Sequence, residues 1–180
     1  MSESRIFEKV LFVGMDYKIP KGGIASVLNT YSTFIHPFKF VRTAAGELNN
    51  VQKVWYAVSG YLLLIWKLFT DRKIEIVHIH SASGTSFWRK NYAIKIAKMM
   101  GKKVVFHCHG GGFKEFRLSN IKKVDAILAK VDCVVCLSGE WNNYFQSIGC
   151  RHIVTIKNVI REPNLSLIHI SEPTRHAQIS

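Results

Sequence analysis

Four short, almost wholly apolar runs constrain the fold of this 180-residue chain more than any other feature. They are Lys9–Gly14, Ile74–His80, Lys103–His109 and Cys133–Ser138. Strands of a parallel sheet are buried on both faces, so they read as continuous apolar runs rather than as alternating ones. Weaker runs of the same kind occupy Phe38–Thr43 and His152–Asn158. The sequence therefore predicts parallel strands covered by helices.

Segments with helical periodicity separate these runs. Apolar residues step by three and four in the segments Ile24–Ile35, Trp88–Met100 and Trp141–Ile148. Gly101 and Gly149 follow the last two segments, as glycine commonly does after a helix. Alternating strands and helices predict right-handed crossovers and an α/β fold, a Rossmann-like doubly wound parallel sheet.

The stretch Trp55–Phe69 is the most apolar of the chain and admits two interpretations. It is too short to span a bilayer, and Lys67 interrupts it near its end. On length we favour a core helix that covers the sheet. The alternative is a helix whose outer aromatic side chains touch a membrane surface.

Charge indicates the kind of partner. Lys and Arg number 25 against 12 Asp and Glu, a formal net charge of +13, while 48% of the residues are hydrophobic. This composition is that of a globular domain that attracts anions. Because the lysines are spread along the chain without a nucleic-acid motif, we expect a phosphate-bearing substrate or an anionic lipid leaflet and no nucleic acid.

The four cysteines, without a secretory signal in the first eight residues, indicate a reducing cytoplasm. Cys133 and Cys136 form a C-x-x-C pair inside a predicted strand. That spacing puts the two thiols on opposite faces of a strand, whereas a redox pair needs a helix N-terminus and zinc needs further ligands. We therefore predict core cysteines.

Ligands of open α/β sheets bind beyond the carboxyl ends of the strands. Gly22 and Gly23 lie after the first predicted strand and directly before a helix, where free backbone N–H groups could hold a phosphate or a carboxylate. The pair is not G-x-G-x-x-G, so no dinucleotide site is predicted. Glycines that only form a turn would give the same pattern.

Two pairs of histidines occupy neighbouring predicted strands: His78 with His80, and His107 with His109. Residues two apart share one face of a strand, so four imidazoles could gather around a transition metal. Neither motif carries the carboxylate that metal sites usually recruit. We predict no metal, structural roles for the two deeper histidines, and hydrogen-bonding or acid–base work by His80 and His109. Gly110–Gly112 let the backbone approach a ligand closely.

Five segments in this order resemble glycosyltransferase family 4, the retaining enzymes of the GT-B fold, and specifically their N-terminal, acceptor-side domain. The segments are "KGGIASVL", "EIVHIHSASGTSFWRK", "KKVVFHCHGGGFKEF", "DCVVCLSGEW" and "HIVTIKNVI". The resemblance covers nearly all of residues 8–160. It is greatest to members that build bacterial capsular or exopolysaccharide repeat units on a lipid carrier.

The resemblance implies transfer of a hexose from a nucleotide sugar to a glycan or lipid-linked acceptor, without cofactor or metal, in bacterial cell-surface polysaccharide synthesis. It implies that Gly22 and Gly23 lie against the donor diphosphate and that His109 is the catalytic histidine beside the donor sugar. It also implies a cytoplasmic location, with peripheral contact at the anionic inner face of the plasma membrane. Residues expected to bind acceptor or substrate are His80, Ser81, Ser83, Arg89, Lys90, Gly110 and Gly111.

The expected domain organisation is a GT-B N-terminal domain over residues 1–160 and the start of an interdomain linker over 161–164. "LSLIHISEPTR" resembles the conceptual translation of a sequencing-library adapter, so residues 165–180 are expected to be a non-native tail rather than a native irregular one. Where the family often has Asn-Gly before its second domain, Asn158 is followed by Val159. We expect the donor-binding C-terminal domain to be missing and this fragment to be inactive.

Two other functions stay open. The paired H-x-H motifs could serve a metal-dependent hydrolase, which metal analysis would test. The chain could also be a non-catalytic module that binds glycan or phosphate.

Overall fold

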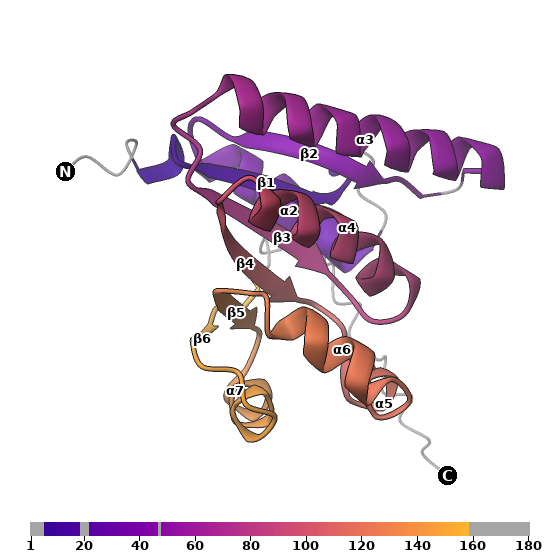
Figure 1. Cartoon of the computed structure of the whole chain (residues 1–180), viewed down its shortest axis with the longest axis vertical. Helices are drawn as coiled ribbons and strands as arrows, with labels where there is room; N and C mark the ends of the chain where they lie inside the picture. Colours follow the sequence, from indigo (N-terminus) through magenta and orange to yellow (C-terminus); the bar gives the residue numbers. More distant parts are fainter. Residues whose placement is uncertain (1–5, 19–21, 47, 159–180) are drawn as a thin grey trace, which may run out of the picture.

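The fold is an α/β sandwich built on one parallel sheet (Figure 1). A computed structural model describes residues 6–18, 22–46 and 48–158. The six strands have the order β2-β1-β3-β4-β5-β6, and every neighbouring pair is parallel. The strands are β1 (Val10–Met15), β2 (Lys39–Ala44), β3 (Ile76–Ser81), β4 (Lys103–Cys108), β5 (Cys133–Cys136) and β6 (Ile153–Thr155).

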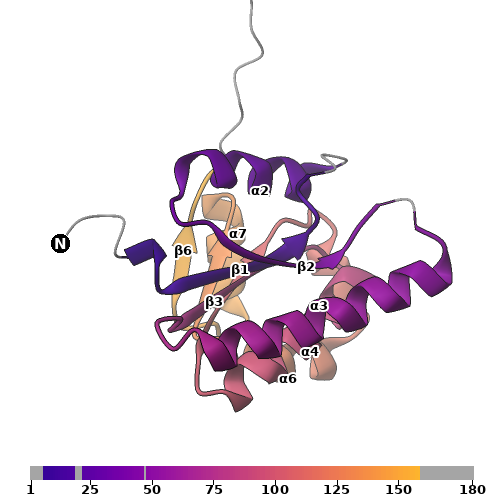
Figure 2. The same cartoon turned by 90° about the horizontal axis from the view of Figure 1, so that it is seen from above.

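Six helices connect and cover these strands: α2 (Gly23–Phe34), α3 (Asn50–Thr70), α4 (Thr85–Met99), α5 (Phe113–Leu118), α6 (Ile121–Leu128) and α7 (Gly139–Ser147). Figure 2 shows α2 on one side of the sheet and α3, α4 and α6 on the other. The arrangement follows from strand order, because the crossover from β1 to β2 runs in the opposite direction to the later crossovers and a right-handed connection then needs the opposite face.

The two faces of the sheet differ in composition. The face under α3, α4 and α6 holds the main apolar core, to which Leu11, Val77 and Phe106 contribute from successive strands. Side chains of a strand alternate between faces, so Phe12 and the histidines of β3 and β4 lie on the α2 face. Tyr31 of α2 contacts both Phe12 and His80 there.

The predicted fold class is confirmed, and all six predicted strands and three predicted helices are present. The helices α5 and α6 were not predicted, because the segment Phe113–Leu128 is divided into two short pieces. The domain limits at 160 and 164, the tail from Leu165 and the Asn158–Val159 junction lie at or outside the end of the described residues.

Helix α3 corrects one prediction. It covers the sheet as expected and packs Tyr61 against the core, but only Gly60, Leu64 and Leu68 of its residues are buried, so the interpretation as a core helix is wrong for its outer aromatic side chains. Trp55 and Phe69 are each 72% exposed. Among the described residues, no helix has both the length and the apolar composition to cross a bilayer.

Gly60 sets how closely α3 approaches β2. A Cβ at this position would lie 2.2 Å from the carbonyl oxygen of Arg42 and 3.2 Å from the Cα of Thr43. Both atoms belong to the backbone of β2, which pairs with β1, so neither can move like the end of a side chain. The glycine is therefore required by the packing of the helix against the sheet.

We expect the change Gly60→Ala to lower the free energy of unfolding. Alanine gains about 0.5–1 kcal/mol of helix propensity over glycine. Overpacking against fixed backbone costs about 1–3 kcal/mol or more, and this cost dominates. Urea unfolding followed by circular dichroism measures the difference. Gly139→Ala is the control, because a Cβ at Gly139 meets nothing within 4 Å; equal stability of the two variants would contradict the packing argument.

Candidate active site at the carboxyl edge of the sheet

The chain changes direction between β1 and β3, whose connections leave toward opposite faces of the sheet. Crevices at such a switch point are the usual ligand sites of open α/β sheets. The connections that begin at this edge include the one from β1 to α2, the one from β3 to α4, and the one from β4 to α5. The predicted site residues lie on these connections, at the ends of β3 and β4, or on the first turns of α2 and α4.

Gly22 and Gly23 form the N-terminus of α2. Gly22 is the N-cap, with φ of 97°, a conformation that favours glycine. No side chain caps the helix, and its first turn has no acidic residue. A Cβ at either glycine would meet nothing within 4 Å. The start of α2 therefore has open space beside its two glycines and carries the positive end of the helix dipole, a suitable setting for an anion.

The four histidines form one stacked cluster on the α2 face. His80 is paired with His107 across β3 and β4. The ring centroids are 4.6 Å apart for His78 and His80, 4.7 Å for His80 and His107, and 4.2 Å for His107 and His109. Parallel register and the two-residue repeat of a strand together produce this arrangement.

Two hydrogen bonds link the rings in pairs. Nδ1 of His80 lies 2.9 Å from Nε2 of His109, and Nε2 of His78 lies 3.3 Å from Nδ1 of His107. In each pair one nitrogen donates and the other accepts, so the tautomers of the partners are coupled. The Nε2 atoms of His80 and His107 are buried without a partner in the described structure.

Burial keeps the histidine cluster neutral. His80 and His107 are each 1% exposed. Burial, with the neighbouring histidines as a second cause, lowers the pKa of His78 to about 3 and that of His107 to about 2. Burial and the surrounding imidazoles and Lys90 also lower the pKa of His80 well below its usual value. All of these rings are therefore uncharged at neutral pH.

His109 is the member of the cluster at the end of β4. Its backbone N–H donates to the carbonyl oxygen of Ser81 at 2.8 Å, which continues the ladder one residue past the strand. Burial lowers the pKa of its imidazole to about 4. Because Nε2 faces His80, Nδ1 is the ring nitrogen left to reach a ligand. A neutral imidazole in this position can form a hydrogen bond to a sugar hydroxyl or stabilise developing charge.

The glycine loop after His109 packs on the loop after β3. A Cβ at Gly110 would lie 2.9 Å from the backbone nitrogen of Ser83, so Gly110 allows the two loops to touch. A Cβ at Gly111 would meet nothing within 4 Å, so that backbone is open to a ligand. The structure thus brings Ser83 and Gly110 together in the loops beside His109, and Gly111 follows with open space around it.

Ser81 and Lys90, predicted to border the acceptor, are buried in this structure. The hydroxyl of Ser81 donates to the carbonyl of Ala82 and lies 3.3 Å from the hydroxyl of Ser86. Lys90 is 3% exposed and its amine donates to the hydroxyl of Thr43. Burial lowers its pKa to about 7. Arg89, half-buried on the first turns of α4, is the more accessible of the two basic residues.

Asp16 is a residue of this edge that the sequence analysis missed. It follows β1 directly, is 6% exposed, and accepts hydrogen bonds from the hydroxyl of Tyr56 at 2.6 Å and the backbone N–H of Lys18 at 3.1 Å. Burial raises its pKa, but these hydrogen bonds and Arg42 outweigh that effect and hold it below the usual value. The sequence feature that could have indicated Asp16 is an acidic residue directly after the first predicted strand.

Three of the histidines lie close enough together to be candidate metal ligands. One ring nitrogen from each of His78, His80 and His107 lies within 4.8 Å of the others. Tetrahedral zinc, with Zn–N bonds of about 2.0–2.1 Å, spaces its ligand atoms about 3.3 Å apart, which is also the separation of Nε2 of His78 from Nδ1 of His107. The charged groups that shift the pKa values of these three rings are other histidines and Lys90. No carboxylate is among them. The three rings are close enough to hold a metal ion but lack the carboxylate partner that metal sites usually recruit.

The cysteines of the C-x-x-C pair lie in β5, and all four cysteines are free thiols. Cys136 is buried in the core, while Cys133 is half-buried at the start of the strand. Burial raises the pKa of the Cys133 thiol, which opposes thiolate chemistry at neutral pH.

Comparison with protein families identifies the chain. A model of Glycosyltransferase Family 4 matches residues 32–162, a segment that holds all four clustered histidines and begins after Gly22 and Gly23. No curated protein and no solved structure matches the chain. The chain therefore belongs to glycosyltransferase family 4, and its six-stranded parallel sheet is the Rossmann-like N-terminal half of that family's GT-B fold.

Proposed function

We propose that this domain serves a retaining, metal-independent glycosyltransferase that moves a hexose from a nucleotide sugar to a glycan or lipid-linked acceptor. The observation that carries the proposal is the position of His109, a neutral imidazole at the carboxyl edge of the sheet beside the open glycine Gly111. Family membership supports glycosyl transfer in general.

Each part of the edge has a role in this proposal. The open N–H groups at the start of α2, after Gly22 and Gly23, hold the donor diphosphate. The imidazole of His109 hydrogen-bonds the donor sugar and stabilises the charge that develops on it as the bond to the diphosphate breaks. Ser83, Arg89 and the backbone of Gly110 and Gly111 border the acceptor. His80 holds the ring of His109 through Nδ1.

We further propose that activity requires a complete protein, in which this domain is joined to a donor-binding domain. Most of the binding energy for the nucleotide would come from that second domain, so the 180-residue chain alone is expected to transfer no sugar. The proposed setting is bacterial capsular or other cell-surface polysaccharide synthesis, at the cytoplasmic face of the plasma membrane.

A transfer assay tests the proposal. The complete protein, taken from source DNA read across codon 164, is incubated with radiolabelled nucleotide sugars and with bacterial lipid extract or oligosaccharides as acceptors. We expect label to move into the acceptor, with release of nucleoside diphosphate. Release of free sugar without transfer would contradict the proposal.

The same preparation tests the metal-dependent hydrolase, which the spacing of His78, His80 and His107 favours. We expect EDTA to leave transfer unchanged and elemental analysis to find no stoichiometric zinc or other transition metal in the purified protein. One bound metal ion per chain, lost together with activity on chelation, would support the hydrolase instead. Binding of oligosaccharide by this chain, with no transfer by the complete protein, would support a non-catalytic module.

A further inference from the structure

Helix α3 uses only one narrow face to pack on the protein. Gly60, Leu64 and Leu68 are its buried residues, and they lie on one side of the helix at intervals of four. Tyr56, next to this side, contacts β2, since the guanidinium of Arg42 lies 4.3 Å from the centre of its ring. The remainder of the circumference faces away from the sheet.

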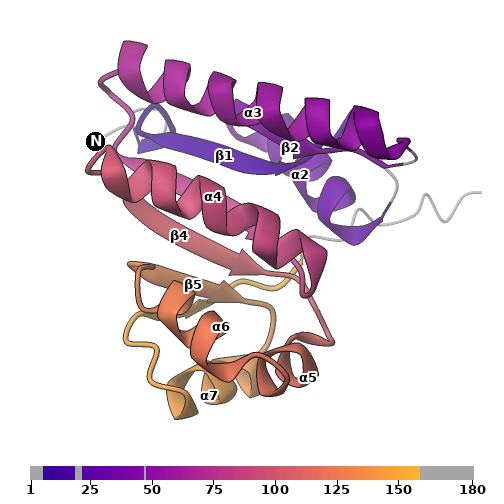
Figure 3. The same cartoon turned by 45° about the vertical axis from the view of Figure 1, so that its right-hand side comes forward.

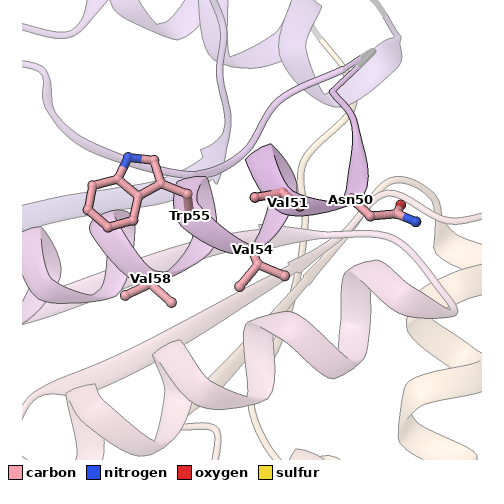
Figure 4. Close-up of a pocket in the computed structure, with 5 residues that line it drawn as sticks. All are labelled: Asn50, Val51, Val54, Trp55 and Val58. Atoms are coloured by element: carbon pink, nitrogen blue, oxygen red, sulfur yellow. The ribbon is translucent and has the colours of Figure 1, made fainter.

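The outward side of α3 is apolar along its whole length. We call it the apolar face of α3; its most exposed members are Val51, Val54, Trp55, Leu62, Trp66 and Phe69, with exposed fractions of 61–80%. Val51, Trp55, Leu62 and Phe69 are 4, 7 and 7 residues apart in turn, which aligns them on one side of a helix. Figure 4 shows the first part of this face, where Val51, Val54, Trp55 and Val58 line a shallow apolar depression.

Helix α4 extends this surface. Figures 1 and 3 show α3 and α4 side by side on the same side of the sheet. The rings of Tyr61 and Tyr92 are 6.0 Å apart, and the hydroxyl of Tyr61 donates to the carbonyl of Arg89. Tyr92 is 58% exposed and Met99 is 85% exposed. Two helices thus contribute to one exposed surface rich in large apolar side chains.

The charge of these two helices has one sign. The 21 residues of α3 and the 15 residues of α4 include no Asp or Glu. Their exposed or half-buried basic residues are Lys53 and Lys67 on α3 and Arg89, Lys95 and Lys98 on α4. Tryptophan and aliphatic side chains on one face, together with lysine and arginine elsewhere on the helix, are the composition of helices that lie in the interface of an anionic membrane.

We propose that the apolar face of α3, continued by α4, binds peripherally to an anionic phospholipid bilayer, with α3 lying in the plane of the interface. A second copy of the chain is the less favoured occupant, because each chain carries a net charge of +13 and two such faces would repel. An anionic lipid surface supplies the opposite charge and accepts the aromatic side chains.

The orientation of α3 connects this surface to the candidate active site. Its N-terminus follows β2, so the apolar face begins at the carboxyl edge of the sheet where His109 lies. A lipid-linked acceptor anchored in the bilayer would present its head group along the membrane surface toward that edge. This link to the acceptor rests on the proposed function, whereas the membrane contact itself does not.

Vesicle co-sedimentation tests the membrane contact. The 180-residue chain is mixed with vesicles of phosphatidylcholine alone and with vesicles that also contain phosphatidylglycerol. We expect binding to the anionic vesicles, weakening at high salt, and a shift of tryptophan emission to shorter wavelength. The triple variant W55S/W66S/F69S should reduce the partition coefficient by about tenfold or more. Absence of wild-type binding to the anionic vesicles would overturn the proposal.

Two controls separate the alternatives. Phe34→Ser, on the opposite side of the sheet in α2, removes a side chain that is 75% exposed and should leave vesicle binding unchanged. The melting temperature of the triple variant should equal that of wild type, since all three side chains are exposed. Equal vesicle binding by the triple variant and wild type would overturn the proposal. It would also be overturned if wild type bound no vesicles but formed a dimer that the triple change converts to a monomer. Transfer to a water-soluble acceptor by the complete protein should survive the triple change, which distinguishes failure of membrane binding from failure of the proposed function.

Discussion

Replacing His109 with alanine is expected to lower kcat of the complete enzyme by about 10²–10³-fold, the usual effect of removing a group that stabilises charge in the transition state. KM for the nucleotide sugar should change much less, because the proposed contact strengthens only as the glycosidic bond breaks. Initial rates of sugar transfer at varied donor concentration measure both constants.

Three comparisons make the test of His109 specific. His152→Ala removes an exposed imidazole near β6 and should leave kcat unchanged. His109→Gln keeps a hydrogen-bonding group and should retain more activity than His109→Ala. Because the pKa of His109 is held at about 4, kcat/KM should show no ionisation of this residue near neutral pH. Wild-type kcat in His109→Ala would contradict the catalytic assignment.

Acid is expected to destabilise the domain strongly, because four histidines are held neutral. In the unfolded chain each histidine binds a proton below pH 6.5, whereas the folded protein does not until much lower pH: about 4 for His109, 3 for His78 and 2 for His107. The unfolded state therefore binds more protons as pH falls below 6.5, and stability decreases. Each histidine contributes up to about 1.4 kcal/mol per pH unit, so the free energy of unfolding should fall steeply as the pH drops below 6.5.

Urea unfolding at a series of pH values between neutrality and pH 5 measures this dependence. His78→Phe removes one titrating ring from the cluster, and the slope of unfolding free energy against pH should fall by about 1.4 kcal/mol per pH unit. His152→Ala, which removes an exposed histidine, should leave the slope unchanged. Stability that stays constant from pH 6.5 to pH 5 would show that the cluster is protonated or open in solution.

The positions of the strands, and with them the carboxyl edge of the sheet, could be predicted from the sequence because parallel strands leave a strong signal. Doubly buried strands appear as apolar runs, and the residues that interrupt this pattern at their ends, such as His109, Gly110 and Gly22, mark the carboxyl edge. The two-residue spacing of His78 and His80 also fixes a common face. These inferences need only the periodicity of a strand.

The contacts within the cluster could not be predicted, because register between strands depends on tertiary packing. The pairing of His80 with His109 follows from the alignment of β3 with β4, which no local pattern specifies. The burial of Lys90 and the exposure of Trp55 have a similar origin. A helix with apolar residues on most of its circumference does not itself reveal which side the sheet covers, and Gly60 decides that through the close approach of Arg42.

The measurement that tests the central claim most directly is ¹⁵N NMR of the histidine side chains in the complete protein, titrated with the donor nucleotide sugar. If the donor sugar binds at Nδ1 of His109, as we propose, this resonance should shift with donor while those of the exposed His36 and His152 stay in place. His80 should respond in a smaller degree through its hydrogen bond with His109. Unchanged His109 resonances at donor concentrations that saturate sugar transfer would contradict the account.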